Sequence, residues 1–552
     1  MIQLPRADRV RLLLLVLGAF VALMVASLSV PARAELRLAE AGTERVHFTY
    51  RGKALLSFGG GSDFIFYVGR DAYDWLRWAD WSQAHGMNHL RAYPPLSWQM
   101  VESVTLADGG DRADVLFPYQ ETDPGSRQFD LTRFNPAYWA RFRQQLSDLQ
   151  DRGIIVHLLM VNGWQAKQTA DNWSGHFFNP ANNVNPETDV LAGERGPLGL
   201  YDGRSNAHEG LRALQKAWLE KLVRETAGFD NVYFDLVHEI ADHFETWAPA
   251  QDWIDEMAQT VGHAWERQTP GRPLILGMDT GGLTAEQRQW IFARPYFDLL
   301  IYGKGHSPDR ALAWRRQYKK PYVAQESYDE NNQKYSWVYP DQRHSLRKYV
   351  WRLVMAKTQQ IDVYAKRLGY GDLRLAPGVE TNPLNYDPRG INGFEADAAI
   401  LRALFDKLQD YPSLRPRGLV YGSTWSEQVT DTYRRVKSFV RTVGNPVPWE
   451  LTMTSAVLSS ETEALIHMAS APDRNRLPFA AREIRISDLA LADGDYLADL
   501  IDPSAGPIKQ LPIEVRRGRT EFQLPAFVDD IAIHVTAKPA SPQTASAHSP
   551  NR

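Results

Sequence analysis

Two glutamates stand at the ends of short apolar segments that are typical of β-strands. Glu239 closes residues 232–239, and Glu326 lies near the end of residues 321–327. Two carboxyl groups flanking a glycosidic bond can hydrolyse it, one protonating the leaving oxygen while the other attacks or activates water. Either glutamate alone could be an ordinary solvated residue. Together they indicate a glycosidase, in which a separation of roughly 5 Å implies retention and roughly 6.5–9.5 Å implies inversion.

Three residues at other predicted strand ends could position these carboxyl groups. Arg91 could keep one carboxylate ionised by charge pairing and hydrogen bonding, and we expect it to be the partner of the nucleophile. Tyr302 could donate its hydroxyl to the same carboxylate, or it could be a packing residue at the rim. His238 could bond either the substrate or the neighbouring acid.

The elements that must position these residues alternate regularly. Short apolar segments between residues 54 and 412 are separated by longer amphipathic stretches, a pattern that favours βα units around a parallel sheet. Eight candidate strands predict an α/β fold, a (β/α)8 TIM barrel, whose catalytic residues emerge at the carboxyl ends of the strands. The predicted strands are residues 55–59, 87–93, 154–161, 232–239, 273–279, 297–303, 321–327 and 361–366.

Long loops with aromatic residues could build a binding site on that face. Residues 94–129 and 163–205 are rich in Gly, Asn, Asp and Pro. Trp164 is the best placed to stack on a sugar ring, and Trp337 is a second candidate, although Trp more often simply packs. Asp63 follows a run of glycines and could bond a sugar hydroxyl, or the glycines could only turn the chain.

The chain changes character after residue 412. Brief β-prone segments separated by turn signals fill residues 453–537 and predict a small C-terminal β-sandwich. We expect a catalytic domain at 35–415, a β-sandwich domain at 416–537 and a disordered tail at 538–552.

The first 34 residues have the form of an export signal. Arginines precede the apolar residues 12–30, and Ala32-Arg33-Ala34 offers a cleavage site. We expect a signal peptide at 1–34 and a periplasmic or extracellular protein with no membrane association after cleavage. An uncleaved membrane anchor is the alternative, because 19 residues approach the roughly 20 that span a bilayer.

The amino-acid composition argues against several classes of function. The absence of cysteine excludes disulfides, thiol nucleophiles and cysteine-ligated zinc. His238 and His243 are five residues apart rather than the four of a zinc-peptidase helix, which argues against a zinc peptidase. A glycosidase with two carboxyl groups needs no cofactor, so we expect no metal and no cofactor. A net charge of -4 gives no basic field for nucleic acid.

Over residues 46–412 the arrangement resembles the clan A glycoside hydrolases, which are retaining (β/α)8 enzymes. Residues 51–59, 85–91 and 129–139 look most like the cellulase-like and apiosidase-like branches, and residues 493–503 resemble the small sandwich that often follows such barrels. The resemblance implies that Glu239 is the acid/base and that Glu326 is the nucleophile with Arg91 nearby.

Two positions depart from the clan pattern. His238 stands where many members have Asn, and strand eight lacks the usual Trp. Lys366 or Arg367 could face the site there and suit an acidic sugar, or could be surface charges.

We therefore expect a monomeric, exported glycoside hydrolase that cleaves a β-linked polysaccharide or oligosaccharide. The alternative is a non-catalytic polysaccharide-binding or export-assisting protein on a degenerate hydrolase barrel.

Overall fold

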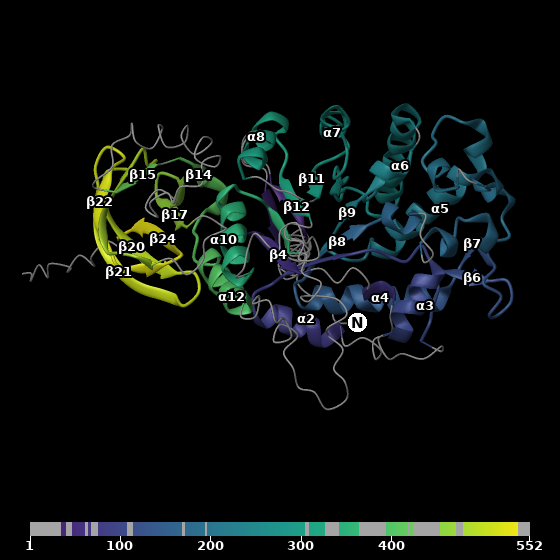
Figure 1. Ribbon diagram of the computed structural model, residues 1–552, viewed down its shortest axis with the longest axis horizontal. Helices are drawn as coiled ribbons and strands as arrows, with labels where there is room; N and C mark the ends of the chain where they lie inside the picture. Colours follow the sequence, from purple (N-terminus) through teal and green to yellow (C-terminus); the bar gives the residue numbers. More distant parts are fainter. Residues whose placement is uncertain are drawn as a thin grey trace, which may run out of the picture.

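The larger part of the chain is an α/β unit, drawn from purple to green in Figure 1. The computed structural model describes residues 35–39, 47–60, 65–67, 75–107, 114–167, 172–193, 196–244, 246–303, 308–325, 342–363, 394–417, 419–422, 453–470 and 478–538. Its central strands form two parallel four-stranded sheets, ordered β10-β9-β8-β5 and β11-β12-β13-β4. Each of the eight predicted strands overlaps one of them, although β4 and β13 each extend one residue beyond the predicted range. They are β4 (Ser57–Gly60), β5 (His89–Ala92), β8 (Ile155–Leu159), β9 (Val232–Asp235), β10 (Leu276–Gly277), β11 (Leu300–Gly303), β12 (Tyr322–Gln325) and β13 (Gln360–Val363).

The two parallel sheets meet at both of their edges. A parallel bridge joins Asp279 to Ile301, next to β10 and β11. At the other edge, the Asn88 backbone N–H donates to the Phe58 carbonyl oxygen over 3.0 Å, and the Asn88 side chain accepts from the Phe58 N–H over 3.1 Å. The eight strands therefore follow one another in a cyclic order.

Alternate side chains of these strands face a common interior. Ile155, Tyr233, Ile301 and Val323 come from four different strands and belong to one buried apolar cluster. Phe48 belongs to the same cluster and comes from a small antiparallel sheet of β1 (Arg37–Ala39), β2 (His47–Tyr50) and β3 (Lys53–Ala54). Since side chains alternate along a strand, the residues two positions after these apolar ones also point inward.

Helices pack on the outside of the parallel strands (Figure 1). In α4, Asn135 accepts a hydrogen bond from the Ala137 N–H and Pro136 opens the first turn, while Gly153 follows the helix with φ +68. Its buried residues recur at helical spacing, so one face packs against the strands. The outer helices are α2 (Trp75–Ala84), α3 (Trp98–Ala107), α4 (Pro136–Asp151), α5 (Glu209–Thr226), α6 (Trp247–Gln268), α7 (Ala285–Phe292), α8 (Pro308–Tyr318), α10 (Gln342–Met355) and α12 (Phe394–Phe405).

The loops after β5 and β8 are long. The first contains a hairpin of β6 (Tyr119–Glu121) and β7 (Phe129–Phe134). The second contains short 3-10 helices, among them η2 (Gly163–Ala166). None of the helices in the described residues is both long and apolar enough to cross a membrane.

The C-terminal region is rich in sheet, as predicted. One sheet has the order β14-β16-β17-β24-β20-β21, a second has β15-β19-β22, and β18 pairs with β23. Ile466 of β17, Ile486 of β19 and Leu524 of β22 share one apolar core, so the two larger sheets bury their inner faces together. The strands are β14 (Arg415–Pro416), β15 (Leu419–Gly422), β16 (Thr454–Ser459), β17 (Glu463–Ala469), β18 (Pro478–Phe479), β19 (Arg482–Ser487), β20 (Gly494–Asp502), β21 (Gly506–Val515), β22 (Thr520–Leu524), β23 (Phe527–Val528) and β24 (Asp530–Ala537).

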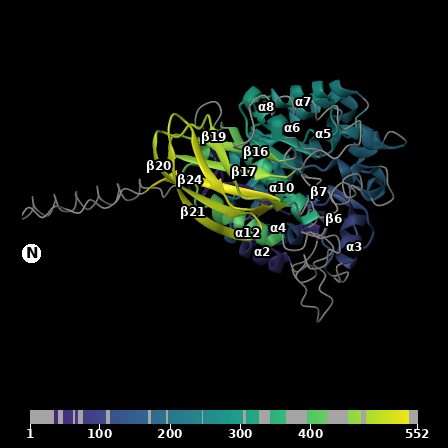
Figure 2. The same cartoon turned by 60° about the vertical axis from the view of Figure 1, so that its left-hand side comes forward.

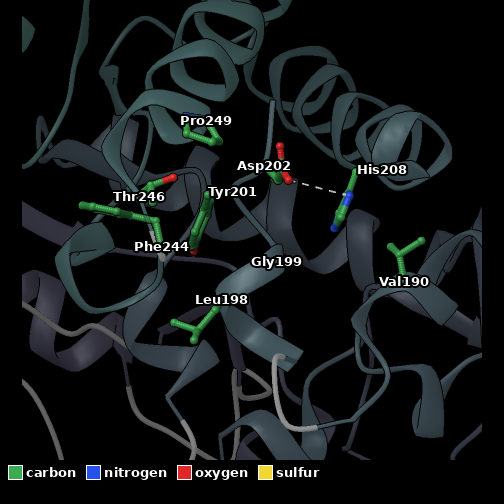
Figure 3. A pocket seen from close by; sticks show the side chains of 9 residues that line it. All are labelled: Val190, Leu198, Gly199, Tyr201, Asp202, His208, Phe244, Thr246 and Pro249. Carbon is green, nitrogen blue, oxygen red and sulfur yellow. Dashed lines mark ion pairs between the residues drawn. The ribbon is translucent and has the colours of Figure 1, made fainter. Parts of the chain in front are cut away.

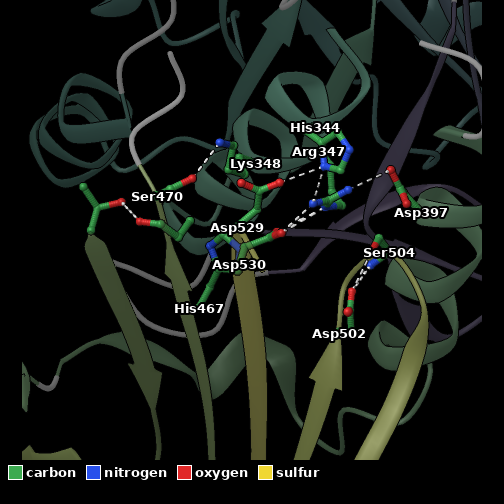
Figure 4. Close-up of polar contacts among 12 residues, drawn as sticks. His344, Arg347, Lys348, Asp397, His467, Ser470, Asp502, Ser504, Asp529 and Asp530 are labelled. Atoms are coloured by element: carbon green, nitrogen blue, oxygen red, sulfur yellow. Dashed lines mark hydrogen bonds and ion pairs between the residues drawn. The ribbon is translucent and has the colours of Figure 1, made fainter. Parts of the chain in front are cut away.

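Helix α10 joins the C-terminal sheets to the α/β unit (Figure 2). The buried Arg347 of this helix donates to Asp530 of β24, with 2.7 Å between Nη2 and Oδ1, and lies 3.6 Å from Asp397 of α12 (Figure 4). His467 of β17 stands 3.3 Å from the same Asp530 carboxylate. Burial alone would raise the pKa of Asp530, but the hydrogen bond from His467 and the charge of Arg347 hold it below its ordinary value. An ionised aspartate and an arginine are therefore paired inside this interface.

Candidate active site

Polar side chains from six strands converge in the interior, at the carboxyl ends of the parallel sheets. His157, Asp235 and Gln325 each lie two positions after an apolar residue of the interior cluster, which explains why they point inward. Each member of the group is almost completely buried. The group consists of Arg91 on β5, His157 on β8, Asp235 on β9, Asp279 after β10, Gln325 on β12 and Asp362 on β13.

Gln325 connects several members of this group. Its side-chain amide lies 2.5 Å from His238 Nδ1. In the orientation that satisfies its neighbours, the amide oxygen accepts from His238 and from Arg91 Nη1 at 3.2 Å, and the amide nitrogen donates to Asp235 over 3.2 Å. These bonds hold Gln325, the last residue of β12 and the one before Glu326 in the sequence.

Asp279 holds the backbone that carries Glu239. Its Oδ1 accepts from the N–H groups of Gly281 and Gly303, over 2.9 and 3.0 Å. Its Oδ2 lies 3.0 Å from His238 Nδ1 and accepts from the Glu239 N–H over 3.3 Å. One carboxylate thus ties the ends of β9, β10 and β11 together.

Glu239 adopts a left-handed backbone conformation, with φ 52 and ψ 43, at the start of the 3-10 helix η8 (Ile240–Asp242). Residues other than glycine adopt this conformation uncommonly, and residues held in it are enriched at functional sites. Gly163 is part of those surroundings, because a Cβ atom there would lie 2.5 Å from the Glu239 carbonyl oxygen. The side chain of Glu239 is 21% exposed, so it reaches the surface of the site.

Lys167 is a functional candidate that the sequence did not reveal. Its Nζ lies 2.8 Å from Glu239 Oε2, and its side chain is 32% exposed. Lys167 immediately follows η2, in the loop after β8. Its position beside Glu239 depends on the path of that loop, and no spacing in the sequence predicts it.

Burial sets the protonation of the interior group. It raises the pKa of Asp235 to about 8, and the nearby negative charge of Asp279 adds to this effect. Burial lowers the pKa of His89 to about 3 and that of His157 well below its ordinary value. His157 is therefore neutral at pH 7, and its 3.7 Å approach to Asp235 is not an ion pair.

Arg91 is 1% exposed, and its Nε lies 3.4 Å from Asp362 Oδ2. The structure places it beside Gln325, and so next to the residue that precedes Glu326. Glu326, Asp63 and Trp337 lie outside the described residues, as do Lys366 and Arg367. Trp164 lies in η2, just past β8 as predicted, with its side chain partly buried.

Tyr302 does not lie on the interior face with Arg91. Its hydroxyl accepts from Arg310 Nη1 over 3.2 Å, and its ring packs 5.3 Å from that of Trp314, with the Arg288 guanidinium 4.8 Å from its centre. The register of β11 explains this placement, because Ile301 faces the interior and the next residue must face the helices. The alternative of a packing residue therefore fits better than the predicted bond to the nucleophile.

A pocket of about 170 Å³ lies between the loops that follow β8 and β9 (Figure 3). The rings of Tyr201 and Phe244 line it together with Asp202, whose carboxylate lies 3.9 Å from His208. It opens near the amino ends of α5 and α6.

Among the described residues, no cluster of three or more His, Asp or Glu side chains is arranged to hold a metal ion.

No protein-family model matches the chain. No curated protein sequence matches it either.

Solved structures do match. One is a glycoside hydrolase with a TM-score of 0.53 and 12% identity, over 92% of this chain and 98% of that one. Another is a family 5 glycoside hydrolase from Bacteroides vulgatus, with a TM-score of 0.52 and 12% identity, over 91% of this chain and 93% of that one. Family 5 belongs to clan A, so the predicted resemblance is confirmed in the fold. The chain has the fold of the clan A glycoside hydrolases.

Proposed function

We propose that this chain is an exported glycoside hydrolase that cleaves β-glycosidic bonds of a polysaccharide or oligosaccharide with retention of configuration. The observation that carries the proposal is the placement of Glu239. Its partly exposed carboxylate stands at the carboxyl end of β9, on a backbone held by Asp279. The same interior group includes Gln325, the residue before Glu326. The fold shared with glycoside hydrolases and the apolar residues 12–30 support hydrolysis and export, respectively.

We also propose how the parallel strands and the C-terminal sheets are arranged. We take the eight strands to close as a (β/α)8 barrel, because they are parallel, cyclic in order and bonded at both sheet edges. The C-terminal sheets form a β-sandwich around their common core.

The reaction takes two steps. In the first, a Glu326 oxygen attacks the anomeric carbon and forms a glycosyl ester, while the bond to the leaving oxygen breaks and Glu239 gives that oxygen its proton. In the second, Glu239 takes a proton from water, whose oxygen attacks the anomeric carbon and releases Glu326. Both glutamates return to their starting protonation at the end of the cycle.

Arg91 and His238 position the two carboxyl groups. The buried charge of Arg91 lies on β5 beside Gln325, the residue before Glu326 in the sequence, and a cation there favours an ionised carboxylate. His238 uses Nδ1 toward Asp279 and Gln325, so any bond of its ring to the substrate must come from Nε2.

The test is hydrolysis of a panel of β-linked glycans by the full chain, run beside Glu239→Gln and Glu326→Gln. We expect turnover in the unchanged protein only, and NMR of the first product should show the β-anomer. Absent turnover with equal glycan binding by all three proteins would instead favour a non-catalytic binding protein.

A further inference from the structure

The contact between Lys167 and Glu239 conflicts with the role of a proton donor. An ammonium 2.8 Å from a carboxylate favours the ionised form of that carboxylate. Glu239 must carry a proton when the glycosidic bond breaks. The contact therefore opposes protonation of Glu239, and the proposed reaction requires Lys167 to take another anionic partner.

Lys167 is suited to move. Its side chain is 32% exposed, although the residues of η2 before it, Gln165 and Ala166, are buried. A lysine ammonium on a flexible stem exchanges one anionic partner for another at little cost. Arg91 differs, because it is enclosed in the interior against Asp362 and cannot turn toward a ligand.

We infer that Lys167 recognises a carboxylate on the substrate, so that this protein acts on a β-linked glycan containing uronic acid. The inference rests on the proposed function and deepens it. When the acidic sugar binds, its carboxylate replaces Glu239 as the partner of the Lys167 ammonium. Glu239 then takes up a proton from solvent and can donate it to the leaving oxygen. A neutral glycan leaves the ion pair intact and is a poorer substrate.

The experiment compares uronic acid oligosaccharides of several β-linkages with their carboxyl-reduced derivatives, which keep every linkage and lose only the charge. The full chain is assayed unchanged and as Lys167→Met, which keeps the length of the side chain. Lys167→Arg keeps the cation. Lys216→Met is the matched control, because Lys216 pairs with Glu256 on the outer helices.

We expect the unchanged protein to cleave an acidic oligosaccharide about ten- to a hundredfold faster in kcat/KM than its reduced form, the range of a charge-assisted bond. Lys167→Met should abolish this preference, while Lys167→Arg and Lys216→Met should retain it. On the reduced substrate, Lys167→Met should stay active to higher pH, because Glu239 keeps its proton more easily without the ammonium. Equal losses on both substrates would overturn the inference and leave Lys167 as a positioning residue.

Binding separates this inference from the proposed function. Glu239→Gln frees Lys167, so this variant should bind the acidic oligosaccharide more tightly than the unchanged protein does. Adding Lys167→Met should remove that gain. If no glycan is cleaved but this pattern holds, the hydrolase proposal fails and carboxylate recognition stands. If acidic and reduced forms bind equally to Glu239→Gln, carboxylate recognition is wrong even where hydrolysis occurs.

Discussion

Asp279 holds two candidate functional residues in one geometry. Three backbone N–H groups donate to its carboxylate, and the His238 ring lies 3.0 Å from Oδ2. A buried carboxylate with several donors is costly to replace, because any donor that loses its acceptor remains unsatisfied away from water. The Glu239 N–H is one of these donors, so we expect the alignment of the proposed acid/base group to depend on Asp279.

Asp279→Asn tests that dependence. The amide oxygen can replace only one of the two carboxylate oxygens. The amide N–H groups then face the N–H donors that bonded the other oxygen. We expect kcat to fall by about ten- to a hundredfold through misplacement of Glu239. Asp298→Asn is the control. Asp298 lies just before the amino end of β11, away from the site, and accepts a hydrogen bond from the Leu276 N–H. We expect steady-state kinetics to show an unchanged kcat for this control. A similar loss of kcat in both variants would refute the anchoring role of Asp279.

Asp235 makes stability depend on pH. Its pKa rises from an ordinary 3.8 to about 8 in the folded protein, chiefly through burial. The folded state therefore holds a proton that the unfolded state has lost, so the stabilisation present below about pH 4 is lost as pH rises toward 8. The slope from one such group is at most about 1.4 kcal/mol per pH unit.

Asp235→Asn should remove this contribution. Urea unfolding midpoints measured from pH 5 to pH 8.5 should fall less steeply in the variant than in the unchanged protein. Parallel pH dependences in the two proteins would show that Asp235 does not take up the proton.

At the scale of the elements, a strand's register decides which side chains reach the site. Tyr302→Phe removes a hydroxyl that bonds Arg310 on the helix side of β11. We expect kcat/KM within about twofold of the unchanged protein and a stability loss of about 1 kcal/mol. Kinetics and thermal unfolding check both values. A large loss of kcat without a change in melting temperature would instead indicate that Tyr302 acts in the active site.

The eight strands could be predicted because each is a short apolar segment between helical stretches, and this pattern is local. The interior group was only partly predictable. Arg91 and His238 stand at predicted strand ends, whereas Asp279 and Gln325 gain their importance from partners on other strands. Lys167 lies in a loop whose path follows from tertiary packing. The face that Tyr302 takes could not be predicted, because the ends of a strand do not reveal which side each residue faces and a shift of one position reverses it.

At the scale of the whole molecule, a few apolar residues of the C-terminal sheets pack into the core of the α/β unit. Leu458 and Leu465 of the sheets belong to the same apolar cluster as Leu346 and Val350 of α10. The buried Arg347 adds charge pairs across this contact (Figure 4). We therefore expect the two parts to unfold together in one calorimetric transition.

Arg347→Met tests that coupling. It leaves Asp530 and Asp397 buried without their cation, a change that costs about 3–5 kcal/mol. Calorimetry should show a lower melting temperature and two separated transitions. Arg417→Met is the control, because Arg417 and Asp488 form an exposed pair that contributes at most about 1 kcal/mol. Equal melting temperatures in the two variants would mean that the interface does not rely on Arg347.

The central claim is that Glu239 and Glu326 divide the work of one double displacement, and azide rescue tests it most directly. The measurement uses an activated aryl β-glycoside of the sugar found in the glycan panel. Azide should accelerate Glu239→Ala by about tenfold or more and yield the β-glycosyl azide, because the anion replaces water in the step that needs the base. With Glu326→Ala it should yield the α-glycosyl azide. No acceleration in either variant, together with wild-type turnover in Glu239→Ala, would contradict the account.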